Sequence, residues 1–391
     1  MLYCQHEKFI LIHTWKETLD MRLQLTDLSR EAYQTISSAG TDFLYAVDYL
    51  QSGIQIREFM PSLQEIYPKP DLKERLICGF LEANPTAERA SIVKKIQNWM
   101  NKKNVPVKRE DIFILCFALQ LSEEAASFLL GFVSDYGIHY RSPRELAYSY
   151  CLRSGKTYQE AVHFYESLAD IPCTEAAPKI TKEPPHTSAI CRIFQTVTTD
   201  QEFRETYSAH LSDFGLLHQK AFETFSRYYS RLANPSPDKT SIPESSMETT
   251  KKISVEDIMR DYLSLGMPSN KKRRHLSSLQ KLLKDGWPNA TLLFNILNRK
   301  ENVSRKLLIL LYLVTQNILD TEYSELDEDY LTPQERLDEH KWALDSILDE
   351  CGMNTLDPRS AYDWLVLYSL YTEPDEDMDE RMKEIIQFLF P

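Results

Sequence analysis

Apolar residues recur at spacings of three and four along almost the whole chain, and this pattern limits the fold more than any other feature. Runs in which Val, Ile or Thr alternate with polar residues between Asn-Gly or Asp-Gly turns are absent. The pattern therefore predicts an all-α protein. With 391 residues, of which 42% are hydrophobic, the chain is long enough for two or three domains with buried cores.

Two stretches interrupt the helical pattern and predict the domain boundaries. Residues 171–188 are rich in Pro, Thr and Lys, and residues 234–252 are rich in Pro, Ser and Thr, so both are expected to be linkers. Residues 189–233 between them fit a small helical hairpin. The flanking segments, 22–170 and 253–391, are expected to be multi-helix bundles. Met21 is a further possible start, so whether residues 1–20 belong to the fold stays open.

The two large blocks share a co-linear set of residues, which predicts that one repeats the other. One group recurs 197 positions later, the next 196 positions later and a third 215 positions later. The rise from 196 to 215 predicts a 19-residue insertion in the second block, near Asp320 to Lys341. Chance similarity between two sets of amphipathic helices is the alternative. The polar, Gly and Pro pairs that favour a repeat are Asn98/Asn295, Asn101/Asn298, Lys102/Arg299, Lys103/Lys300, Arg109/Arg305, Gln120/Gln316, Gly137/Gly352, Pro143/Pro358 and Arg144/Arg359.

Each block contains three helices in the same order. The first block has predicted helices near 71–81 and 87–100, a polar loop, and a helix whose Ile112, Leu115, Cys116 and Leu119 share one face. The second has counterparts at 276–284 and 290–297 and a third helix capped by Ser304. Its apolar run Leu307 to Val314 is expected to be buried.

The stretch IQNWMNKKNVPVKREDIFILCFALQL resembles the end of a lambda-repressor-like helix-turn-helix domain. In that family a recognition helix ends in a short polar loop with a proline, and the next helix ends in an Ala-Leu-x-Leu pattern, here Ala118, Leu119 and Leu121. The glutamine and glycine that are usual in the motif are absent. The resemblance covers about 50 residues and implies two helix-turn-helix-like units that present polar side chains to DNA bases and cations to phosphates.

Basic residues gather in both units. No acidic residue occurs from Arg89 to Arg109, and Lys271 to Arg274 precede the first helix of the second unit. The predicted DNA contacts are Lys94, Lys95, Asn98, Lys102, Lys103, Lys271, Lys272, Arg273, Arg274, Asn295, Arg299 and Lys300.

Each of these residues also has a structural interpretation. Lys94 and Lys95 fit a solvated helix face, and Asn98 and Asn295 fit either adenine readers or helix-end caps. Trp99 is expected in the core. Arg144 and Arg359 are expected to start helices or form buried pairs.

Acidic residues gather at the end of the chain. The net charge is -13, but Asp320 to Pro391 contains 21 acidic and 5 basic residues. The preceding 319 residues have a net charge of +3. An acidic protein can thus still carry basic binding units.

Motifs of enzymes and cofactor sites are absent. The sequence lacks GxGxxG, GxxxxGK[ST], HExxH, CxxC and GxSxG, so we expect no enzyme, cofactor or metal site. Asp375, Asp377 and Asp379 alternate as in a calcium loop, but Glu380 stands where that loop requires glycine.

The chain is expected to be a cytoplasmic protein. Its longest fully apolar runs are eight residues, which excludes a transmembrane helix. The seven cysteines are widely spaced and fit buried free thiols in a reducing cytoplasm.

Two functions remain open. The first is a bacterial regulator that binds duplex DNA through one or both basic units, and the second is a non-enzymatic helical scaffold that binds a protein partner. The oligomeric state is not predicted.

Overall fold

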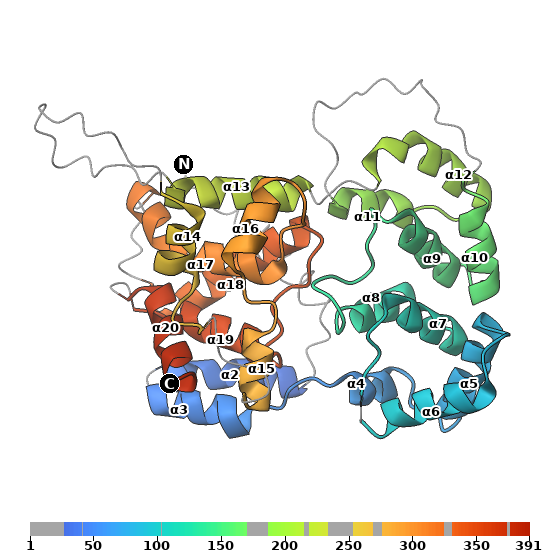
Figure 1. Cartoon of the computed structure of the whole chain (residues 1–391), viewed down its shortest axis with the longest axis horizontal. Helices are drawn as coiled ribbons and strands as arrows, with labels where there is room; N and C mark the ends of the chain where they lie inside the picture. Colours follow the sequence, from blue (N-terminus) through green and yellow to red (C-terminus); the bar gives the residue numbers. More distant parts are fainter. Residues whose placement is uncertain are drawn as a thin grey trace, which may run out of the picture. The chain divides into compact units, whose positions relative to one another are not determined.

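The expected amphipathic segments form helices, because each buries one apolar face. The computed structural model describes residues 27–40, 42–102, 104–169, 187–214, 219–233, 253–268, 276–323, 331–373 and 376–391; side chains are described except at 188 and 316–323. The described residues are helical with no strand, so the all-α, multi-helix prediction is confirmed (Figure 1).

The chain divides into two compact units. Unit 2 consists of Arg57–Lys220 with Leu348–Asn354, and unit 1 consists of Met1–Ile56, Ala221–Ile347 and Thr355–Pro391. This division differs from the expected domains, because residues 27–56 belong with the second block and not with the first.

Unit 2 is a bundle around a single hydrophobic cluster that runs from Phe59 to Tyr207. Its helices are α4 (Phe59–Ile66), α5 (Leu72–Ala83), α6 (Arg89–Met100), α7 (Arg109–Leu119), α8 (Glu123–Leu130), α9 (Pro143–Arg153), α10 (Tyr158–Glu166), α11 (Thr187–Gln195), α12 (Asp200–Ala209) and the 3₁₀ turn η2 (Leu211–Asp213).

Unit 1 is assembled from segments that are far apart in the sequence. Its elements are α2 (Asp27–Gly40), α3 (Phe43–Asp48), η1 (Tyr49–Gly53), α13 (Gln219–Ala233), α14 (Val255–Ile258), η3 (Met259–Leu263), α15 (Ser278–Lys284), α16 (Ala290–Leu297), α17 (Arg305–Tyr323), α18 (Pro333–Glu350), α19 (Ala361–Leu370) and α20 (Met378–Leu389).

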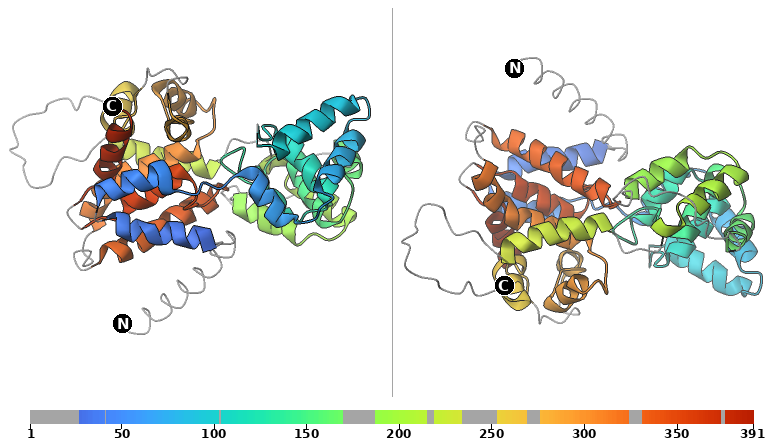
Figure 2. Two further views of the ribbon diagram at one scale, coloured as in Figure 1. Left: turned by 90° about the horizontal axis from the view of Figure 1, so that it is seen from below. Right: turned by 90° about the horizontal axis from the view of Figure 1, so that it is seen from above.

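The first and last helices of unit 1 lie side by side. Helices α2 and α3 pack against α19 and α20, as Figures 1 and 2 show in several orientations. The buried Trp364 indole donates a hydrogen bond of 3.0 Å to the Ala32 carbonyl oxygen, which lies 332 positions earlier. The expected hairpin at 189–233 is likewise divided, since α12 lies in unit 2 and nearly all of α13 in unit 1.

One polar network occurs in both units. In unit 2, the Arg109 guanidinium donates two hydrogen bonds of 2.7 Å to the Glu145 carboxylate and also reaches the Gly137 carbonyl oxygen. The same carboxylate accepts the backbone N–H of His139. Arg109 is thereby fixed as the first residue of α7.

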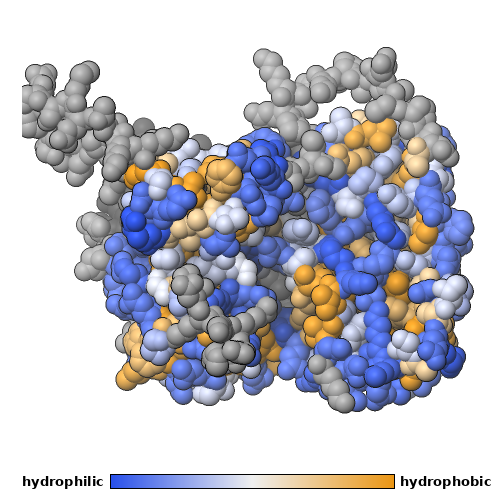
Figure 3. All heavy atoms as spheres, in the orientation of Figure 1, coloured by the Kyte–Doolittle hydropathy of each residue, from blue (hydrophilic) through white to orange (hydrophobic). Residues whose placement is uncertain are grey.

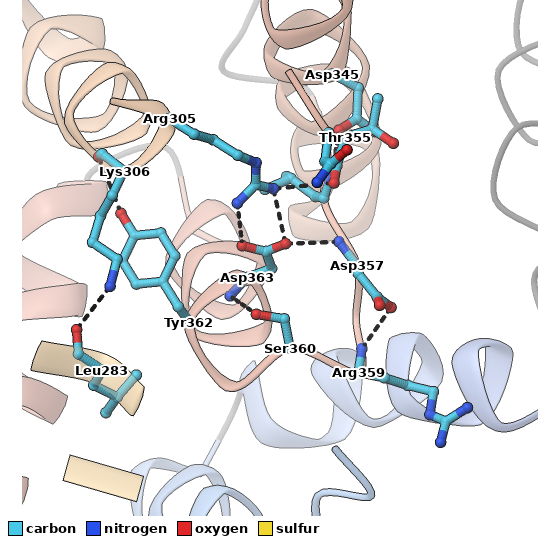
Figure 4. A network of polar contacts seen from close by, with 12 residues as sticks. Leu283, Arg305, Lys306, Asp345, Thr355, Asp357, Arg359, Ser360, Tyr362 and Asp363 are labelled. Atoms are coloured by element: carbon cyan, nitrogen blue, oxygen red, sulfur yellow. Dashed lines mark hydrogen bonds and ion pairs between the residues drawn. The ribbon is translucent and has the colours of Figure 1, made fainter. Parts of the chain in front are cut away.

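In unit 1, Arg305 repeats this arrangement at the start of α17 (Figure 4). It donates two bonds of 2.8 Å to Asp363 and one of 3.0 Å to the Thr355 carbonyl oxygen, and Asp363 accepts the Asp357 N–H. The same donors and acceptors recur in the same order, which supports the predicted repeat.

The network also corrects the predicted alignment of the third group of residues. Glu145 and Asp363 are both the third residue of a helix, after Ser142 and Ser360, and they lie 218 positions apart rather than 215. Pro143 opens α9, whereas Pro358 lies in the loop before α19. Pairing Pro143 with Pro358 and Arg144 with Arg359 was therefore wrong, because these residues have different backbone roles.

The extra residues of the second block lengthen two helices. Helix α17 has 19 residues where α7 has 11, and α18 has 18 where α8 has 8. Residues 324–330 between α17 and α18 lie outside the described residues.

Candidate interaction surface

Helix α6, the predicted recognition helix, turns Ile92, Ile96 and Trp99 into the core of unit 2. The core position expected for Trp99 is confirmed, and its ring meets that of Phe80 edge to face. Polar residues cover the opposite side. The helix ends at Met100, Asn101 is its C-cap, and Lys102 then adopts a left-handed backbone with φ of 53°. The predicted sequence of helix, polar loop and helix is therefore present.

Unit 1 ends its corresponding helix in the same way. Helix α16 ends at Leu297, Asn298 is its C-cap, and Arg299 has a φ of 58°. The N–H groups of Lys102 and Arg299 each donate a hydrogen bond of 2.9 Å to the carbonyl oxygen three residues earlier. The two helix ends are thus equivalent in backbone geometry.

Lys95 serves the internal packing of unit 2. Its ammonium lies 2.7 Å from the Asp111 carboxylate on α7 and within about 5 Å of the Phe80 and Trp99 rings, at 4.7 and 5.1 Å. An ammonium held between a carboxylate and two aromatic faces is already neutralised within the protein. These contacts leave less of its charge available to a phosphate.

Lys102 also has a partner within the protein, because its ammonium forms an ion pair with Glu58, just before α4. Both side chains are exposed, so this pair is weak. Lys103 lies outside the described residues. The exposed Lys94 and half-buried Asn98 lie one turn apart on α6, and neither side chain forms a hydrogen bond or ion pair with another described residue.

The candidates in unit 1 are only partly described, because Lys271 to Arg274 lie outside the described residues. The Asn295 amide bonds to Glu301 at 3.1 Å, which favours the helix-end role that the sequence left open. The Arg299 guanidinium lies 4.0 Å above the Phe222 ring of α13. Lys300 is exposed, and its N–H donates to the Asn295 carbonyl oxygen.

The two arginines that follow prolines have structural roles, as expected. Arg144 is the second residue of α9 and bonds Glu110 and Tyr148. Arg359 is buried and donates to the Gln55 carbonyl oxygen.

The loop between α6 and α7 exposes two valines that the sequence did not single out. Val105 is 50% exposed and Val107 is 82% exposed, while Pro106 between them is buried. In the corresponding loop of unit 1, Val303 is only 4% exposed. The sequence does carry a sign of this difference in exposure, because the loop of unit 1 is one residue shorter than the loop of unit 2.

The viewed surface is mostly hydrophilic, with separate hydrophobic patches (Figure 3). A hollow in unit 1 is lined by Gln51, Ser277, Ser278, Leu279, Gln280 and Leu389. Its lining contains no carboxylate, imidazole, thiol or amine, and the Gln280 amide donates to the Leu389 carbonyl oxygen. The hollow therefore offers no acid–base pair.

The described residues contain no group of three or more His, Cys, Asp or Glu side chains arranged to hold a metal ion. No described helix has both the length and the apolar character to cross a bilayer.

The thiols are mostly but not wholly buried. Cys116, Cys151 and Cys351 are buried free thiols, Cys191 is half-buried and Cys78 is exposed on α5. Burial raises the pKa of the Cys151 thiol to about 12. Cys4 and Cys173 lie outside the described residues. The expectation of buried thiols was wrong for Cys78, because that residue lies on the outer face of its helix.

Comparison of the chain with family models, with curated proteins and with solved structures finds no match.

Proposed function

We propose that this chain is a non-enzymatic helical scaffold that binds a protein partner, with unit 2 as the binding part. The main support is the placement of the basic residues around α6. Lys95 pairs with Asp111, Lys102 with Glu58, and Arg109 with Glu145. A phosphate-binding surface needs cations that can neutralise DNA, and these three already neutralise carboxylates of the protein.

The exposed loop after α6 adds to this proposal. Val105 and Val107 are exposed in the loop that follows the predicted recognition helix. Valine contributes nothing to phosphate binding, whereas apolar contact is the usual centre of a protein interface. A cytoplasmic location is part of the proposal, and the buried free thiols support it.

Duplex-DNA binding through a lambda-repressor-like unit is the second candidate. The observation that favours it is the pair Lys94 and Asn98, which share the outer side of α6 and could reach a phosphate and a base edge. Such binding would weaken with salt, because each neutralised phosphate contributes roughly 0.9 to the log-log slope.

Two measurements on the full-length chain separate these candidates. The first titrates a labelled random duplex at about 50 and about 200 mM salt, using wild type, Lys94→Glu and, as a control cation in the same unit, Lys69→Glu. The second isolates the tagged chain from cell extract after nuclease treatment and identifies retained proteins.

If the chain is a scaffold, a partner protein is retained after nuclease treatment, and Lys94→Glu does not change the affinity for duplex DNA. A regulator gives salt-sensitive duplex binding that Lys94→Glu weakens and Lys69→Glu preserves. Loss of every partner after nuclease treatment, together with that binding, would overturn the scaffold proposal.

A further inference from the structure

The segment Asn104–Lys108, which joins α6 to α7, has the properties of a docking edge. We propose that it binds an extended, acidic segment of a partner protein by backbone pairing, with Val105 and Val107 as the apolar contacts. This inference rests on the proposed scaffold function and specifies its binding surface and the chemistry of the partner.

The first argument is that the segment is anchored at its middle and just after its last residue, while Val105 and Val107 face solvent. Buried Pro106 anchors it to unit 2, and Arg109, held by Glu145, fixes the residue that follows Lys108. A proline disfavours the helical region for the residue before it, so extended backbone is favoured at Val105, and Lys108 at the end of the segment is extended, with φ of -95° and ψ of 129°. The segment is therefore organised before any partner arrives, which reduces the entropy lost on binding.

The second argument concerns the backbone. The N–H and C=O groups of Val105 and Val107 form no hydrogen bond with another described residue. In an extended segment these two residues point their backbone groups to one side, and Pro106, which lacks an N–H, points its carbonyl to the other. One side of the segment thus carries the unpaired N–H and C=O groups of both valines. An added strand can pair with these groups, as extended peptides do at exposed edges.

The third argument comes from the repeat. The loop of unit 1 is one residue shorter, and Val303, two positions before Arg305, is 4% exposed. Val107, two positions before Arg109, is 82% exposed. The shared framework can therefore bury this valine, so its exposure in unit 2 is not a requirement of the fold.

The fourth argument selects the partner's charge. Lys108 is exposed and forms no ion pair with another described residue. The nearest acidic residues of α7 are already engaged, because Glu110 accepts the hydroxyls of Tyr148 and Tyr158, and Asp111 pairs with Lys95. A second copy of this loop would bring lysines together, whereas an acidic peptide complements them.

The probe is a fluorescent peptide of about eight residues in which valine alternates with glutamate, a length typical of one strand. Two matched peptides carry lysine in place of glutamate or N-methyl groups on the amides that would pair. Binding to the full-length chain is measured by anisotropy. We expect the acidic peptide to bind at least about tenfold tighter than either matched peptide, since one loses charge complementarity and the other loses backbone pairing.

Variants locate the binding. Val107→Asp should weaken the acidic peptide at least about tenfold without lowering the melting temperature, because the side chain is exposed. Leu282→Asp on α15, an exposed apolar residue of unit 1, is the matched control and should leave binding unchanged. Lys108→Glu should weaken binding and reduce its salt dependence.

Three results would each overturn the inference. The acidic peptide binds Val107→Asp as tightly as wild type, the N-methylated peptide binds as tightly as the acidic one, or no saturable binding occurs up to about 1 mM peptide. The scaffold proposal is judged separately. If a nuclease-resistant partner is retained by both wild type and Val107→Asp, the scaffold stands and the docking edge falls. If no partner is retained at all, the scaffold itself falls.

Discussion

Arg305 holds the Asp363 carboxylate in a two-pronged ion pair, with both hydrogen bonds at 2.8 Å. The side chains are only 11% and 5% exposed, so each charge depends on the other for compensation. Removing one partner leaves a buried, uncompensated charge, which typically costs about 3 to 5 kcal/mol.

We therefore expect Arg305→Met to lower the unfolding free energy of unit 1 by about that amount. The double variant Arg305→Met with Asp363→Leu should be less destabilised, because it leaves no buried charge behind. Urea denaturation of both variants measures the difference. A double variant less stable than the single one would show that the charges are not the source of the cost.

Gly79 on α5 has no room for a side chain. A Cβ atom at this position would lie 2.2 Å from the Cβ of Ala118 on α7. Gly79→Ala should destabilise unit 2 by roughly 1 to 3 kcal/mol, because the two helices must separate, despite the better helix propensity of alanine. Adding Ala118→Gly should recover part of this loss. Thermal unfolding of the single and double variants tests the contact, and additive losses would contradict it.

The half-buried His340 on α18 makes stability depend on pH. Burial, with a smaller effect of Arg336, lowers the pKa of His340 to about 4 from its ordinary value near 6.5. Its ring nitrogen lies 2.9 Å from the Tyr312 hydroxyl. Between these two pKa values the unfolded chain binds the proton and the folded chain does not, so stability falls as pH drops from about 6.5 towards 4.

The expected loss from His340 is about 2 to 3 kcal/mol, full at pH 4 and absent above pH 7. Comparing urea unfolding of wild type and His340→Gln across this range isolates the histidine from the carboxylates that also titrate there. Parallel stability curves for the two proteins would exclude the effect.

Lys94 and Lys95 should differ in their effect on stability. Lys95→Met removes a partly buried ion pair and contacts with two rings, so we expect a loss of about 1 kcal/mol. Lys94→Met changes an exposed side chain and should stay within about 0.5 kcal/mol of wild type. Chemical denaturation of both variants provides the measurement, and equal effects would place Lys95 outside the packing of unit 2.

Local structure was accessible from the sequence because apolar spacing determines it directly. Helices α5, α6 and α7 and their counterparts α15, α16 and α17 follow the predicted order, and Ser304 caps α17 through the Leu307 N–H at 3.3 Å. The buried run Leu307 to Val314 was also predicted correctly.

Long-range packing was not accessible in the same way. The amphipathic face of α2 does not reveal that its partner contains Trp364, so residues 27–56 were assigned to the neighbouring block. The identical Pro-Arg pairs suggest one alignment of the two blocks, but the acidic residue at the third position of the helix, Glu145 or Asp363, gives the structurally correct one.

Whether a basic residue is a free surface cation or is paired within the protein was the hardest property to predict. The sequence places Lys94 and Lys95 side by side with the same chemistry, and only the position of Asp111 on α7 distinguishes a surface cation from a packed one. The exposure of Val107 depends in turn on the loop's path, which a one-residue difference in length altered.

The order in which the chain is synthesised gives the division of unit 1 a further consequence. A ribosome releases α2 and α3 long before α19 and α20, yet these helices cover one another in the finished fold. Unit 2 is formed almost entirely by the continuous segment 57–220. It can therefore collapse first, because its contacts close shorter loops. The apolar faces of α2 and α3 stay uncovered until α19 and α20 are made, and we expect them to be prone to aggregation and to chaperone binding in that interval.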